Sequence, residues 1–144
     1  MLKIVPVLGV LVVGLSVLAG CGAKGPETFP VSGQVLIDGE PLTHGFVQVV
    51  PNDARAAQAP IGEDGTFTLT SFENGDGCAP GTHPVAIIAV ETLSPTSQKW
   101  HAPKKYMSPD TSGLTITVPQ ETDKVTLELT WDGAEPFVEN FAAE

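Results

Sequence analysis

Beyond residue 30, apolar side chains recur at every second position over much of the chain. The alternation is clearest in Leu114–Val118 and Val125–Trp131, where threonine or glutamate separates the apolar residues. A period of two predicts β-strands that place one face on a core and the other face in water. In the second segment, Leu127 and Trp131 are therefore expected to point inward and Glu128 outward.

Other segments extend this pattern. Gly65–Thr70 alternates in the same way, and three less regular segments are expected to form central strands: Val31–Ile37, Phe46–Val50 and Val85–Val90. Short turn signals rich in glycine and aspartate separate the segments, and none of them has a helical period. About six or seven short strands in this length predict an all-β fold, a single antiparallel β-sandwich with Greek-key connections.

Two segments do not fit a strand pattern. The stretch from Glu91 to Thr111 contains three prolines and is predicted to be a long loop that covers a sheet edge. Residues 132–144 form an acidic tail that is expected to be frayed.

The chain begins with a segment of a different kind. Lys3 precedes the almost wholly apolar stretch Ile4–Val17, which is followed by Leu18-Ala19-Gly20-Cys21. A positive residue, an apolar stretch and small residues before a cysteine are typical of a bacterial lipoprotein signal peptide. The stretch is shorter than the roughly 20 residues that a membrane-spanning helix needs. We therefore predict a signal peptide over residues 1–20 and a lipid, such as diacylglycerol carrying palmitate, on Cys21; an uncleaved anchor is the alternative.

This interpretation divides the chain into four parts. Residues 1–20 are the signal peptide, 21–30 a tether, 31–131 the β-sandwich domain and 132–144 the tail. The protein is then expected on the periplasmic or cell-surface side of a membrane. Gly22 occupies the position where aspartate marks inner-membrane retention in enterobacterial lipoproteins, which favours the outer membrane.

The charge of the chain restricts its partners. A formal net charge of −10 makes nucleic acid an unsuitable partner. It also repels anionic lipid headgroups, so that membrane attachment would depend on the lipid of Cys21.

Three segments carry a resemblance to a known family. Gly33–Leu42, Ile61–Leu69 and Pro80–Val85 read GQVLIDGEPL, IGEDGTFTL and PGTHPV, and they resemble strands of carboxypeptidase regulatory-like domains, which are transthyretin-like sandwiches. The later segments Pro103–Tyr106 and Ser112–Val118 are similar to small lipoproteins of planctomycete bacteria. The chain departs from the pattern at His83, where tyrosine is usual, and at Cys78, where alanine is common. The resemblance implies a binding or structural accessory module without known chemistry.

Several residues raise a catalytic or metal-binding hypothesis. His44, His83 and His101, with nearby carboxylates, suggest a metal-dependent hydrolase, but their spacing matches no compact zinc pattern, so we expect neither a metal nor another cofactor. Asn74–Gly77 could supply oxygen ligands to calcium, yet it lacks the spacing of an EF-hand loop, and a tight turn is the simpler explanation.

No motif marks a nucleophile among Ser71, Ser94 and Cys78, so the chain is not expected to be an enzyme. With Cys21 acylated, Cys78 has no partner for an internal disulfide. It is expected to occupy a turn where alanine would serve equally well.

One segment stands out as a candidate binding surface. Trp100 and Tyr106, together with Lys104 and Lys105, form a basic and aromatic cluster in the predicted loop over residues 92–111. Exposed rings there could stack on a sugar or contact a peptide. The leading hypothesis is a lipid-anchored, non-catalytic envelope module with an unknown envelope protein or glycan as its partner. The alternatives are a carbohydrate- or peptide-binding surface on this loop and a metal-dependent hydrolase.

Overall fold

The computed structural model describes residues 26–119 and 124–142, and these form an all-β fold, as the sequence predicts. The signal peptide and Cys21 lie outside the described residues. The strands are β1 (Ser32–Ile37), β2 (Glu40–Pro41), β3 (Phe46–Val49), β4 (Ala57–Pro60), β5 (Thr66–Thr68), β6 (Gly81–Ile88), β7 (Val90–Ser94), β8 (Ser97–Trp100), β9 (Leu114–Val118), β10 (Val125–Leu129) and β11 (Phe137–Asn140). Two one-turn helices, η1 (Lys104–Met107) and α1 (Pro109–Ser112), lie between β8 and β9.

The first sheet is built around β1. One edge of β1 pairs in parallel with β10, and the other edge pairs with β2 and β5 in antiparallel fashion. A Cβ atom at Gly33 would lie 1.9 Å from the carbonyl oxygen of Val125, so only glycine allows β1 and β10 to approach this closely. The sheets are otherwise antiparallel, and this parallel pair is the exception to the predicted arrangement.

The second sheet has the order β4-β3-β6-β9 and is antiparallel throughout. Its inward side chains and those of the first sheet form one apolar core. The buried residues include Val47, Val49, Val85, Ile87, Ile116 and Val118 from the second sheet and Val35, Phe67, Leu127 and Leu129 from the first. The predicted alternation is therefore confirmed for Phe67, Leu69 and Leu127, all of which are buried.

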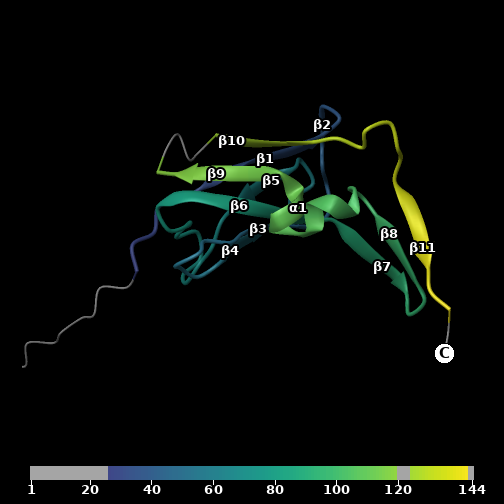
Figure 1. Cartoon of the computed structure of the whole chain (residues 1–144), viewed down its shortest axis with the longest axis horizontal. Helices are drawn as coiled ribbons and strands as arrows, with labels where there is room; N and C mark the ends of the chain where they lie inside the picture. Colours follow the sequence, from purple (N-terminus) through teal and green to yellow (C-terminus); the bar gives the residue numbers. More distant parts are fainter. Residues whose placement is uncertain (1–25, 120–123, 143–144) are drawn as a thin grey trace, which may run out of the picture.

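A third sheet, in the order β11-β8-β7, lies at one end of the domain (Figure 1). The prediction of a plain loop over Glu91–Thr111 is wrong, because this stretch contains most of β7, all of β8 and η1, and most of α1. The expected fraying of the tail is also wrong within the described residues, since β11 pairs with β8 along its whole length. The strands β7 and β11 lack a regular apolar alternation, because their side chains are exposed or only half-buried. The sequence pattern therefore does not predict them.

The short helices are held against the second sheet. The hydroxyl of Ser112 donates a hydrogen bond to the carbonyl oxygen of Val85 in β6. Gly113 then ends α1 in the left-handed conformation, with φ of 71°, and turns the chain into β9. This connection fixes the segment that follows Trp100 onto the main sandwich.

The phase of β10 leads to a stability prediction. Leu127 is 4% exposed and lies in the core, whereas Glu128 is exposed. We expect Leu127→Ala to lower the free energy of unfolding by about 2–5 kcal/mol, through lost burial and the cavity that remains. Glu128→Ala, the control on the opposite face, should change it by less than about 0.5 kcal/mol. Denaturant melts of both variants would test this, and equal losses would contradict the assigned phase.

Candidate functional site

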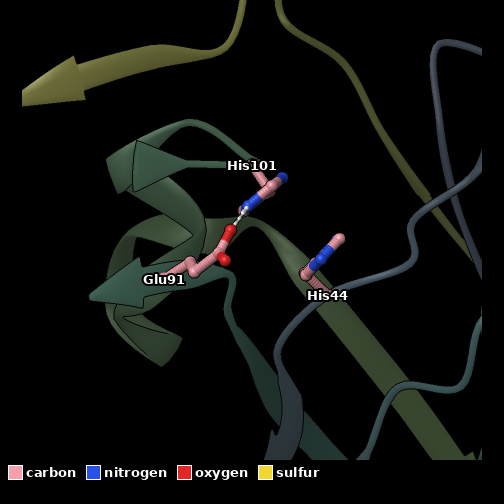
Figure 2. A group of neighbouring side chains, drawn as sticks. All are labelled: His44, Glu91 and His101. Carbon is pink, nitrogen blue, oxygen red and sulfur yellow. Dashed lines mark hydrogen bonds and ion pairs between the residues drawn. The ribbon is translucent and has the colours of Figure 1, made fainter. Parts of the chain in front are cut away.

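The structure brings together two of the three histidines and a glutamate. One possible ligand atom from each of His44, Glu91 and His101 lies within 4.8 Å of the others (Figure 2). The Nε2 atom of His101 is 2.8 Å from Oε2 of Glu91. The two imidazole rings are stacked, with 4.1 Å between their centroids and 8° between their planes. This group of three side chains, the His–Glu–His cluster, is the strongest candidate site among the described residues.

The backbone at the β6–β7 junction positions all three side chains. The segment before β3 lies so close to this junction that a Cβ at Gly45 would be 2.2 Å from the carbonyl oxygen of Ile88, and φ of Gly45 is 108°. On the other side, the N–H of His101 donates to the carbonyl of Ala89 at 2.8 Å. Glu91 follows in β7. The segment that carries His44 is far in the sequence from the β7–β8 hairpin, and the two therefore meet at one point of the fold.

Hydrogen bonds orient the side chains of the cluster, which is open to solvent. The hydrogen bond from His101 holds the pKa of the Glu91 carboxyl below its usual value; partial burial opposes this shift, and the charges of His101, His44 and Lys99 add to it. Oγ1 of Thr43 lies 2.9 Å from Nδ1 of His44, which leaves Nε2 of that ring for another partner. The side chain of His101 is 14% exposed and that of Glu91 45%, so the cluster is accessible from solvent.

The third histidine has a different role. His83 lies in β6, is 9% exposed, and its Nε2 is 2.9 Å from the carbonyl oxygen of Ala79. It is not part of the His–Glu–His cluster. A hydrolase site that uses all three histidines is therefore not formed in this structure.

The segment Asn74–Gly77 forms a turn, and both carboxylate oxygens of its Asp76 accept hydrogen bonds from backbone N–H groups. Oδ1 of Asp76 accepts from the N–H of Ser71 at 2.7 Å, and Oδ2 accepts from Phe72 at 3.0 Å and Glu73 at 3.1 Å. Partial burial raises the pKa of Asp76, but the bonds from Ser71, Glu73 and Phe72 lower it by more, so the net shift is downward. The tight turn is thus the arrangement that the structure supports over a calcium loop.

This carboxylate makes stability depend on pH. The pKa of Asp76 lies below its unfolded value of 3.8, so its stabilising effect is complete above pH 3.8 and is lost as pH falls through the folded pKa. We expect Asp76→Asn to cost about 1 kcal/mol at pH 7 and progressively less below about pH 4. Chemical denaturation between pH 2.5 and 7 would measure this, with exposed Asp53→Asn as the control. A cost for Asp76→Asn that does not change with pH would contradict this role.

The predicted aromatic surface is packed into the domain. Trp100 is 5% exposed and Tyr106 is 4% exposed. The indole Nε1 of Trp100 donates to Oε2 of Glu139 at 3.0 Å, and Phe137 stacks on the indole with 6.3 Å between ring centroids. The hydroxyl of Tyr106 accepts from the N–H of Thr130 at 3.0 Å. These contacts leave little ring surface for a sugar or peptide.

The two lysines of that surface are engaged within the domain. Lys104 Nζ lies 4.9 Å from the centre of the Trp100 ring and 2.6 Å from Oε1 of Glu139. Lys105 Nζ lies 5.0 Å from the Tyr106 ring and 2.7 Å from Oδ2 of Asp132. The cluster that the sequence suggests as a binding surface thus joins the β8–η1 segment to the C-terminal part of the chain.

Glu139 is the partner of this cluster that the sequence does not indicate. Its hydrogen bonds from Lys104, Trp100 and Gln98 hold the pKa of its carboxyl below the usual value. It lies in the acidic tail, among other carboxylates, and no spacing distinguishes it from them.

Because Trp100 is buried, its removal should destabilise the domain, whereas removal of an exposed loop tryptophan would not. We expect Trp100→Ala to lower the free energy of unfolding by about 3 kcal/mol, because a large buried side chain leaves a cavity. Leu93→Ala in the same sheet should cost less than about 0.5 kcal/mol, because Leu93 is 49% exposed. Thermal melts of both variants decide this. An unchanged melting temperature for Trp100→Ala would instead support an exposed binding ring.

Each candidate nucleophile is occupied elsewhere. The Ser71 hydroxyl is buried and donates to the carbonyl of Gly77 at 2.7 Å, and Ser94 Oγ lies 2.7 Å from Oγ of Ser97. Cys78 is fully buried in the core, and burial raises the pKa of its thiol. The expectation that Cys78 occupies an ordinary turn is therefore wrong, because Phe29 pairs with it across a β-bridge and the core surrounds its side chain.

No protein-family model matches the chain, and neither a curated protein nor a solved structure matches it. Within the described residues, no helix has the length and apolar character needed to cross a membrane.

Proposed function

We propose that the protein is a lipid-anchored, non-catalytic module of the bacterial cell envelope. The single observation that carries this proposal is Cys21, which follows Leu18-Ala19-Gly20 at the end of the apolar stretch Ile4–Val17. Small residues allow an extended backbone in a peptidase, and the thiol is the acceptor for a diacylglycerol. The β-sandwich would then be the part of the protein that faces the envelope space.

The folded domain begins only a few residues after Cys21, which would place it close to the membrane. The N–H of Phe29 donates to the carbonyl of Cys78 at 2.9 Å, so the chain is already bound to the domain at this residue. From Cys21 to Phe29, even a fully extended chain reaches only about 30 Å. A lipid on Cys21 would therefore hold the domain close to the bilayer surface, and Gly22 favours the outer membrane.

A structural or accessory role is consistent with the arrangement of the domain. The domain has an all-β fold. The resemblance of its sequence to transthyretin-like domains implies a binding or structural module. The hydroxyl of Ser71 is buried and donates to the carbonyl of Gly77, and the thiol of Cys78 is buried in the core, so neither side chain is exposed to a substrate. Burial of Trp100 and Tyr106 weighs against the alternative of a sugar- or peptide-binding surface over residues 92–111.

The lipid anchor leads to a direct prediction. We expect Cys21→Ser to leave an unprocessed precursor without lipid, because the thioether needs the thiol and the signal peptidase needs the lipid. Wild-type protein should carry diacylglycerol on Cys21, as intact-mass spectrometry would show, and should sediment with membranes. Cys78→Ser is the matched control and should be processed normally. A wild-type N-terminus at any other residue would refute the lipoprotein proposal.

A further inference from the structure

We propose that His44, Glu91 and His101 form a binding site for one divalent transition-metal ion of the zinc and copper class. The site lies at the β6–β7 junction and does not involve the lipid anchor. It rests on the geometry of the His–Glu–His cluster, in which one ligand atom from each residue lies within 4.8 Å of the others (Figure 2).

The donor set determines the class of metal. Two imidazole nitrogens and one carboxylate oxygen suit Zn²⁺, Cu²⁺ and Ni²⁺, whereas Ca²⁺ and Mg²⁺ prefer oxygen ligands alone. Three protein ligands leave at least one coordination position for water or another molecule. The carboxylate of Glu91 brings negative charge to the site, and the formal net charge of −10 on the chain attracts cations.

The distances require only small side-chain movements. Two ligands that each lie about 2.0–2.2 Å from zinc are separated by roughly 3 Å. His101 Nε2 and Glu91 Oε2 are already 2.8 Å apart, so an ion can replace the proton that they share. The stacked ring of His44 must turn its free Nε2 toward the carboxylate. His44 is exposed, which leaves room for this rotation.

Hydrogen bonds to neighbouring groups support two of the three ligands. Thr43 Oγ1 is within hydrogen-bond distance of His44 Nδ1, and such a second partner orients an imidazole toward a metal. The backbone N–H of His101 is tied to Ala89 at 2.8 Å. A simple His101–Glu91 ion pair would explain the 2.8 Å contact, but it would not require His44 to lie over the same ring.

An ion in the His–Glu–His cluster would connect the main sandwich to the third sheet at the β6–β7 junction. His44 belongs to the segment before β3 in the main sandwich, whereas Glu91 lies in β7 and His101 directly follows β8. The metal would therefore cross-link the third sheet to the sandwich. Because a metal that binds only the folded state stabilises it, the melting temperature should rise with metal concentration.

The test uses the full-length chain, purified in detergent without a histidine tag. Calorimetric titration with Zn²⁺ should give one ion per chain, and saturating Zn²⁺ should raise the melting temperature by about 5 °C or more. Ca²⁺ and Mg²⁺ should produce neither effect. With Cu²⁺, the electron paramagnetic resonance spectrum should show coupling to two imidazole nitrogens.

Variants locate the ion. His44→Gln, Glu91→Gln and His101→Gln should each weaken Zn²⁺ binding at least about 10-fold, and the His44→Gln/His101→Gln double variant should abolish the Zn²⁺-dependent rise in melting temperature. The matched control Glu128→Gln removes an exposed carboxylate on β10 and should bind as the wild type does. Melts without metal establish that each variant is folded.

Three results would overturn the proposal. They are the absence of Zn²⁺ binding at millimolar concentration, unchanged binding in the double variant, and a Cu²⁺ spectrum without imidazole coupling. Retained binding in the double variant would place the ion on residues that this variant keeps, such as His83 or the cysteines. None of these results bears on processing at Cys21, so the two proposals fail independently.

Discussion

The parallel pairing of β1 with β10 is the constraint on which the rest of the domain depends. β1 lies between β10 and the strands β2 and β5, so it organises the whole first sheet. Gly33 permits the close approach to Val125, and Asp38 at the end of β1 accepts a hydrogen bond from the Thr130 hydroxyl at 2.8 Å. This second contact fixes the direction in which the chain leaves β10. Beyond it, the chain continues through Asp132 to Glu139 in β11, which pairs with β8 of the third sheet.

The sequence predicts the main sandwich well and the third sheet poorly, for a physical reason. Strands that bury one face carry a period of two, and Leu114–Val118 agrees with β9 residue by residue. β7 and β11 bury few side chains, so selection for a core leaves no such pattern in them. They are held instead by backbone pairing and by one charged residue, Glu139, that binds the buried indole of Trp100. Neither contact has a sequence signature.

The candidate site was only partly accessible to sequence reasoning. Histidine chemistry drew attention to three residues, but their positions along the chain carry no information about which of them meet. The β6–β7 junction decides this, because it brings His44 and His101 together and leaves His83 on the other part of β6. Glu91 had no distinguishing feature among many acidic residues. Conversely, Trp100 was expected on the surface because a proline-bounded segment resembles a loop, whereas pairing with Phe137 covers it.

The burial of Cys78 has a consequence for how the domain tolerates its chemical surroundings. The thiolate is the form of cysteine that attacks oxidants and disulfides, and a buried thiol with a raised pKa holds little thiolate at neutral pH. Access is closed as well, because Cys78 is 0% exposed. The folded domain therefore keeps a reduced cysteine without a reducing agent, and its stability is independent of the redox potential outside it.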